Sequence, residues 1–251
     1  QLRGAIVLPK GITTIGDDAF SYNTSLTSIK IPNTVTSIGK RAFQGCTNLT
    51  SIEIPDTVTY IGDYCFSGCN RLQKIKLSKK IQTINQRLLQ GCSSLTEIEI
   101  PEGVKSIGYA AFSSCNKLTT ITLPASLTSF NGTALAGLSR LTEVKVADGN
   151  NSFKFENGML LSKDGKTMYM ALLTLTEINV PNGVVSIVGD TLSGSSATKI
   201  ILPDTVSSNL SGTVFNGMNK LSTIELSSTS KNLKLVDGNL YSYDDITEVI
   251  D

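Results

Sequence analysis

The stretch from Leu26 to Cys46 reads LTSIKIPNTVTSIGKRAFQGC, and its pattern returns every 23 residues along most of the chain. Three of its columns show the repeat most clearly. The proline column is Pro9, Pro32, Pro55, Pro101 and Pro124, with Ser78 in the missing slot; the leucine column is Leu26, Leu49, Leu72, Leu95, Leu118 and Leu141; the aromatic column is Phe20, Phe43, Phe66, Leu89, Phe112 and Leu135. Self-similarity at a fixed period of this length predicts a repeat architecture.

The segment LTSIEIP, residues 49–55, fits the L-x-x-L-x-L signature of a leucine-rich repeat. Its Ile-Glu-Ile end alternates as a strand does, with Glu53 outward, and proline then ends the strand. Residues 58–62 form a second short extended piece, and residues 63–69 are expected to form one helical or 3₁₀ turn. No coil buries its own apolar edge, so neighbouring coils must stack and share one core.

We therefore predict a mainly β solenoid with short helical or 3₁₀ turns, a leucine-rich-repeat right-handed superhelix of about ten coils of 23 residues. We expect residues 1–251 to form a single leucine-rich-repeat domain. Within it we assign regular coils to 1–147, an inserted hairpin to 148–172, further coils to 173–229, and a hairpin-like C-terminal cap to 230–251.

The inserted segment carries Asp164-Gly165 between two apolar runs, which is a strong hairpin signal. The C-terminal segment echoes it, with Asp244-Asp245 in the place of the turn. One interpretation is that both segments are structural, one a joint and the other a cap. The other is that the first borders a binding surface, because insertions in repeat proteins often map to the binding face.

Composition excludes several classes of function. The chain has 22 basic and 21 acidic side chains, a net charge of +1, which lacks the basic footprint of a nucleic-acid binder. It has no histidine, so Ser-His-Asp and Cys-His catalysis are excluded. No apolar stretch approaches the length of a membrane span.

The five cysteines do not have the spacing of a zinc site, and we expect no metal or cofactor. Four of them stand 23 residues apart and Cys65 is an extra; the column is Cys46, Cys69, Cys92 and Cys115. We interpret them as buried, reduced thiols that act as small apolar fillers.

The outward positions of the strands form the largest regular surface, and their charges alternate between coils. The candidate binding face consists of Lys30, Glu53, Lys74, Lys76, Glu97, Glu99, Glu143 and Lys145. Opposite charges across strands favour solubility and a fixed register. A sugar- or peptide-binding groove on this face is the alternative interpretation.

At the columns I-x-I-P, V-x-x-I-G and A-F-x-G-C the chain resembles the BspA-type leucine-rich repeats of bacterial and protist surface proteins. The match is specific in Ala42-Phe43-Gln44-Gly45-Cys46, and the NGMLLSKDGKT insert is similar to hairpins that interrupt such arrays. The resemblance implies a secreted or surface-anchored protein that binds host proteins, matrix proteins or other cells. It supplies no catalytic residues.

We therefore expect an extracellular or cell-surface, non-enzymatic module for adhesion or protein interaction. Its partner would be a protein or glycan on host or neighbouring cells, without nucleic acid, without membrane insertion, and with the chain itself a monomer. A passive spacer or stalk that presents another domain is the second hypothesis. An enzyme is the third, and it would need a site assembled across coils, for example around Glu97 and Glu99.

Overall fold

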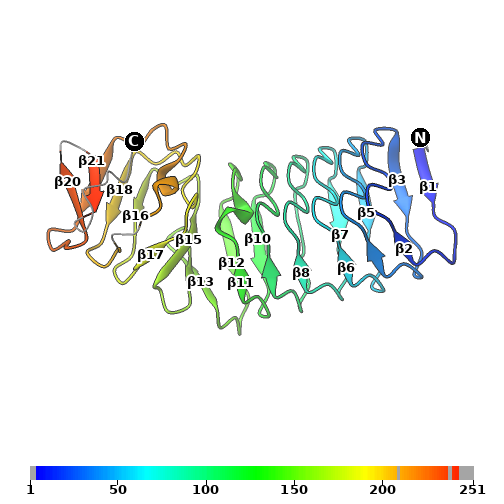
Figure 1. Ribbon diagram of the computed structural model, residues 1–251, viewed down its shortest axis with the longest axis horizontal. Coiled ribbons are helices and arrows are strands. Elements are labelled where there is room, and N and C mark those ends of the chain that lie inside the picture. The colour runs from blue at the N-terminus through cyan, green and yellow to red at the C-terminus, as the bar shows by residue number, and fades with distance from the viewer. Residues whose placement is uncertain (1–3, 208–209, 237–238, 243–251) are drawn as a thin grey trace. The chain divides into compact units, whose positions relative to one another are not determined.

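The computed structural model describes residues 4–207, 210–236 and 239–242 (Figure 1). The chain divides into two compact units, residues 1–151 (unit 1) and 152–251 (unit 2). Both are built from stacked coils of about 23 residues, about ten in all, so the predicted β-solenoid is confirmed. Within the described ranges there is no α-helix, and the only helical elements are two 3₁₀ turns, η1 and η2.

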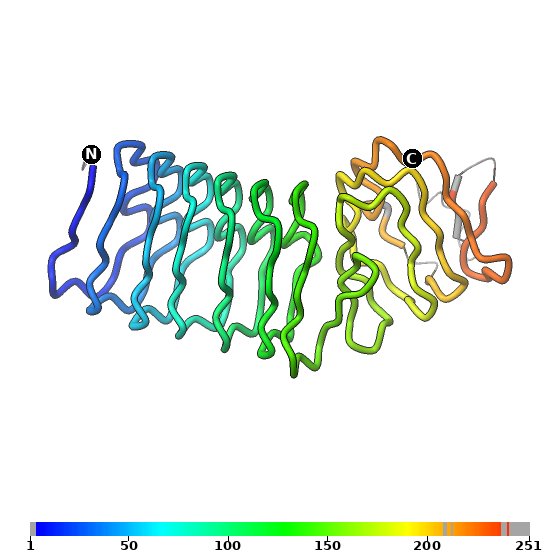
Figure 2. Tube along the Cα trace, turned by 180° about the vertical axis from the view of Figure 1, so that it is seen from behind, coloured from blue at the N-terminus to red at the C-terminus, as the bar shows by residue number. Residues whose placement is uncertain are grey.

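Unit 1 contains two columns of short parallel strands, and most of its coils contribute one strand to each column; Figure 2 shows the coils as a regular stack. The first column, which follows the leucine column, is β1 (Gly4–Val7), β3 (Leu26–Lys30), β5 (Ser51–Glu53), β7 (Lys74–Lys76), β10 (Thr120–Leu123) and β12 (Glu143–Val146). The second column is β2 (Thr14–Ile15), β4 (Ser37–Ile38), β6 (Tyr60–Ile61), β8 (Thr83–Ile84), β9 (Ser106–Ile107) and β11 (Ser129–Phe130), followed by η1 (Gly132–Leu135).

The recurring apolar columns form the core of unit 1. The leucine column from Leu26 to Leu141 is at most 1% exposed, and Phe43, Phe66 and Phe112 are fully buried. The Phe43 ring is stacked between its neighbours, with ring centroids 5.2 Å from Phe20 and 5.4 Å from Phe66. Each aromatic side chain thus buries its two faces against the coils before and after it, as the repeat predicts.

The expected 3₁₀ turn closes two coils, as η1 and η2, whereas the earlier coils of unit 1 close with a turn of a different hydrogen-bond pattern. In the second coil the alternate amides of Ala42, Gln44 and Cys46 bond back three residues within the coil. The amides between them bond to the next coil: Arg41 N–H donates to the Asp63 carbonyl at 2.9 Å, Phe43 N–H to Cys65 at 2.9 Å and Gly45 N–H to Ser67 at 2.8 Å.

This alternation requires residues with left-handed backbone. Arg41 has φ 56° and Gly45 has φ 66°, and the equivalent Tyr64 has φ 59°. In a helix all amides would point along one axis and bond within the segment. Here half of them bond between coils, so the turn column is a ladder that ties the stack together.

Close approach between coils fixes some glycines. A Cβ built on Gly62 would lie 2.4 Å from the backbone nitrogen of Lys40 in the preceding coil. No L-residue other than glycine fits such a contact without moving the backbone. The Ile-Gly pair recurs at 15–16, 38–39, 61–62 and 107–108, while Asn85 and Asn131 take the place of the glycine in two other coils. At Gly39, Gly62 and Gly108 the glycine reflects how tightly the coils stack.

Unit 2 begins with an antiparallel meander, and a hairpin is present at Asp164-Gly165. Its strands β13 (Phe153–Glu156), β14 (Met159–Ser162) and β15 (Thr167–Ala171) pair in order. The last of them pairs in parallel with β17 (Ser186–Ile187), so the meander belongs to the strand ladder of this unit.

The coils of unit 2 follow the same plan as those of unit 1. The parallel ladder is β16 (Glu177–Asn179), β18 (Lys199–Leu202) and β19 (Thr223–Leu226), with η2 at Gly212–Phe215. The antiparallel pair β20 (Leu233–Val236) and β21 (Asn239–Ser242) lies within the segment expected to form a C-terminal cap. Asp244-Asp245, expected at its turn, lies outside the described residues.

Replacement of a fully buried ring tests the shared core. We expect Phe66→Ala to lower the free energy of unfolding by about 3–5 kcal/mol, because it removes a buried ring and leaves a cavity. Phe20→Ala, in the half-buried first member of the column, is the matched control and should cost clearly less. Urea unfolding followed by circular dichroism measures both; equal losses would contradict a core that neighbouring coils complete.

Candidate interaction surface

Six of the eight candidate residues lie exposed on strands of the first column of unit 1, and Glu97 and Glu99 lie exposed at the equivalent positions of the fifth coil, which forms no strand there. We call this surface the strand face. The alternation of each strand produces this arrangement: in β5, Ile52 is 5% exposed while Ser51 and Glu53 face solvent. Glu143 and Lys145 stand on β12, two coils away from Glu99. The face is thus a set of polar rows, one residue per coil, over an apolar floor.

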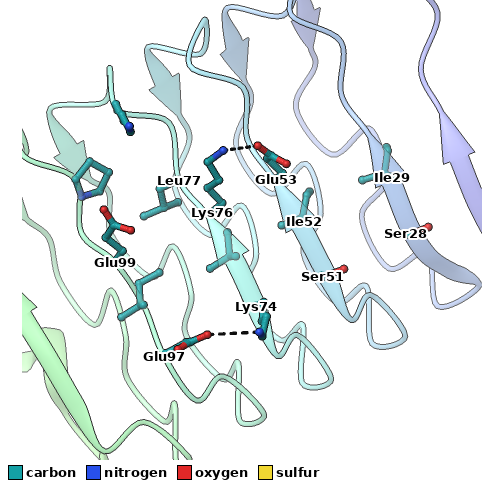
Figure 3. Close-up of a pocket in the computed structure, with 14 residues that line it drawn as sticks. Ser28, Ile29, Ser51, Ile52, Glu53, Lys74, Lys76, Leu77, Glu97 and Glu99 are labelled. Atoms are coloured by element: carbon teal, nitrogen blue, oxygen red, sulfur yellow. Dashed lines mark hydrogen bonds and ion pairs between the residues drawn. The ribbon is translucent and has the colours of Figure 1, made fainter.

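Neighbouring coils pair their charges on this face. The register sets Glu53 of β5 opposite Lys76 of β7, and the two side chains form an ion pair (Figure 3). Lys74 Nζ lies 3.7 Å from Glu97 Oε1 on the other side. The hydrogen bond to Glu53 is the main cause that raises the pKa of Lys76. Lys74 and Lys76 therefore reach in opposite directions along the stack.

An open groove of about 810 Å³ runs over four coils of the strand face. Its lining includes Ser28, Ser51 and five of the candidate residues: Glu53, Lys74, Lys76, Glu97 and Glu99. Lys30 lines a smaller hollow beside it. The charged side chains remain largely exposed, 60–74% in the two ion pairs, so a partner could contact them without displacing buried groups.

The strand ladder is interrupted inside this groove. Residues 96–100 carry the strand sequence of the fifth coil but form no strand, and the sheets β5–β7 and β10–β12 lie on either side of it. The period of the sequence gave no sign of this break, because Ile98 and Ile100 keep their buried positions at 8% and 6% exposed.

A second cluster, which the sequence analysis did not single out, lies on the turn column. Arg87 is sandwiched between two tyrosines, with its Cζ 5.3 Å from the Tyr64 ring centroid and 5.2 Å from that of Tyr109. Its Nη1 donates to the Tyr64 hydroxyl at 3.1 Å, and hydrogen bonding with Tyr109 is the main cause that raises the Arg87 pKa. In the sequence, this contact is indicated by the spacing of 23 residues between Tyr64 and Arg87, which is one repeat.

Several charged side chains of the turn column are paired with side chains of neighbouring coils in the same column. Besides the Arg87 sandwich, Arg41 forms two hydrogen bonds of 2.8 Å to the carboxylate of Asp18 in the preceding coil. This contact is the main cause that lowers the pKa of Asp18. Both surfaces pair charges between coils, but the strand face also carries the open groove, so it is the better candidate for a partner.

The cysteines are free and buried, as expected, and they have a further structural role. Cys69 Sγ donates to the Phe43 carbonyl of the preceding coil at 3.1 Å, and Cys92 Sγ donates to Phe66 at 3.2 Å. Burial raises the pKa of Cys46 from 9.0 to about 11 and that of Cys115 to about 12. At neutral pH these thiols are protonated and therefore poor nucleophiles.

Comparison with known proteins agrees with this architecture. A model of the BspA type leucine rich repeat region matches six copies, over residues 4–94, 69–158 and 165–250. The chain belongs to this family. A search of curated protein sequences gave no significant match.

Solved structures share the fold. The pneumococcal vaccine antigen PcpA is 23% identical at a TM-score of 0.62, over 90% of this chain and 51% of that one. A leucine rich cell surface protein from Faecalibacterium prausnitzii is 24% identical at a TM-score of 0.56, over 90% and 60%. A repeat protein from Bacteroides ovatus is 22% identical at 0.53, over 90% and 72%. The chain thus spans only about half to three fifths of the first two.

Thiol titration tests the buried cysteine column. We expect the native protein to react slowly with an aromatic disulfide reagent near pH 8 and the unfolded chain to react at all five thiols. Since the folded pKa of Cys46 lies above its usual value, the free energy of unfolding should fall as pH rises from about 9 towards 11. Rapid reaction of several thiols in the native protein would contradict the burial.

Proposed function

We propose that this chain is a non-enzymatic module for adhesion or protein interaction, and that its strand face docks a macromolecule on a host, a matrix or a neighbouring cell. The observation that carries the proposal is the open, charged groove over four coils of unit 1. Its exposed charges stand over a floor that contains Ile52 and Ile75, which suits an extended contact with a polar surface.

The chemistry of the groove favours binding over catalysis. Glu97 and Glu99 are both exposed to solvent in an open groove, whereas catalytic sites typically exclude water. Glu97 is also paired with Lys74. The cysteines, the strongest nucleophiles by residue type, are buried and protonated.

We further propose that the module works outside the cell or on its surface. The support is the membership of the BspA family and the likeness to a leucine rich cell surface protein of Faecalibacterium prausnitzii. No helix formed by the described residues is long and apolar enough to cross a membrane.

A passive spacer that presents another domain is the second candidate. It is favoured by one observation, that the similar structures are longer than the part this chain matches, with 51% and 60% of their lengths covered. In that case the charge rows would serve register and solubility alone.

Binding assays separate these two functions. We expect the chain to bind at least one immobilised matrix glycoprotein or arrayed glycan in a salt-sensitive manner. The variant Lys74→Ala/Lys76→Ala should bind roughly tenfold more weakly, because it removes two central charges of the groove.

The matched control is Lys117→Ala/Arg140→Ala, which removes two exposed cations of unit 1 from outside the groove lining. It should bind as the unaltered chain does. Equal weakening by both variants would show that the strand face is not the binding site. Absence of binding to every ligand would favour the function of a passive spacer.

A further inference from the structure

One row of the strand face alternates in sign from coil to coil. Lys30, Glu53, Lys76 and Glu99 occupy the same position in four successive coils, each 23 residues after the last, and all four are exposed. Reading along the stack, the row is positive, negative, positive, negative. Read in the reverse direction it is negative, positive, negative, positive. The reversed row therefore has the opposite charge to the forward row at every position.

A second copy of the chain can exploit this property. Consider two strand faces laid against each other, related by a two-fold axis that runs parallel to the strands and passes between β5 and β7. This operation reverses the order of the coils and keeps each row opposite itself. It sets Glu53 against Lys76 of the second copy, and Lys30 against Glu99 of the second copy.

The rows on either side accept the same arrangement. In the row beyond the proline corner, exposed Asp56 faces Lys79 of the second copy. In the row two residues earlier, Lys74 and Glu97 face the hydroxyls of Ser51 and Ser28 of the second copy. These rows place no like charges together, whereas moving the axis by one coil towards the C-terminus sets Lys30 against Lys145.

The spacing of the charges selects this partner over an extended peptide. Hydrogen-bonded strands of the strand face repeat at about 4.8 Å, and the stacked phenylalanines beneath them at 5.2–5.4 Å between ring centroids. Side chains on one side of an extended peptide repeat at roughly 6.7 Å, so they fall out of register within a few coils. A second copy has the same repeat and matches every coil.

We propose that the strand face of unit 1 is a homophilic docking surface, on which a second copy of this chain binds in antiparallel fashion through the row Lys30, Glu53, Lys76 and Glu99. The inference rests on the proposed function of the strand face and names a partner for it. The contact is polar and weak, so the chain is a monomer when dilute. Between two cell surfaces many copies act together, which multiplies the affinity.

Charge reversal provides the test. In Lys76→Glu the new carboxylate faces Glu53 of the second copy, and in Glu53→Lys the new cation faces Lys76 of the second copy. We expect each variant alone to lose the self-association that the unaltered chain shows in sedimentation equilibrium at high protein concentration and low salt. Beads coated with either variant should fail to aggregate.

A mixture of the two variants should associate again. Every facing pair is then opposite in sign, because the positions reversed in one chain meet the positions reversed in the other. The double variant Glu53→Lys/Lys76→Glu should also recover, and Lys117→Glu, outside the groove lining, is the matched control that keeps association throughout. Circular dichroism verifies that each variant is folded.

Absence of self-association in the unaltered chain, or failure of the mixture to associate while the control does, would overturn the proposal. Binding of the same protein to matrix glycoproteins or glycans distinguishes failure of the homophilic proposal from failure of the proposed function. If that binding is present without self-association, homophilic docking is wrong and the proposed interaction function stands.

Discussion

The hydrogen bonds between successive turns are the constraint on which this structure depends. In the first five coils of unit 1 the turn bonds alternate amides to itself and to the next coil, as Phe43 N–H does to the Cys65 carbonyl at 2.9 Å. Equivalent hydrogen bonds to the next coil are donated by Phe66 N–H to the Leu88 carbonyl at 2.9 Å and by Leu89 N–H to the Ala111 carbonyl at 2.8 Å. The first strand column of the same unit falls into three two-stranded sheets. The turn column is therefore the more continuous spine of the unit.

The packing of side chains reinforces this spine. Stacked phenylalanines, buried leucines and thiols that donate to the carbonyl of the preceding coil all repeat at the same separation along the axis. Each of these contacts needs a neighbouring coil, so no coil is stable by itself and the energy of the fold lies between repeats. The same regularity brings the outward charges into rows. The candidate surface is in this sense a product of the core.

The buried columns were predictable from the sequence because a residue such as Leu49 or Phe66 must occupy the same place in every coil. The alternating bonds of the turn were not, since they depend on left-handed backbone at Arg41 and Tyr64, residue types that seldom adopt it. The positions of the candidate residues on one face followed from strand alternation. The Arg87 sandwich was missed, because its contacts join side chains of three different coils.

Removal of one complete coil tests the central claim most directly. Deletion of residues 72–94 takes out one repeat and leaves every remaining column in step, whereas deletion of residues 72–82 removes about half a repeat and shifts every column that follows. If neighbouring coils complete each other's core and hydrogen bonds, the first variant should unfold cooperatively at a midpoint close to that of the full chain, and the second should lose the β-sheet signal of unit 1. Equal stability of the two variants in urea would contradict the account.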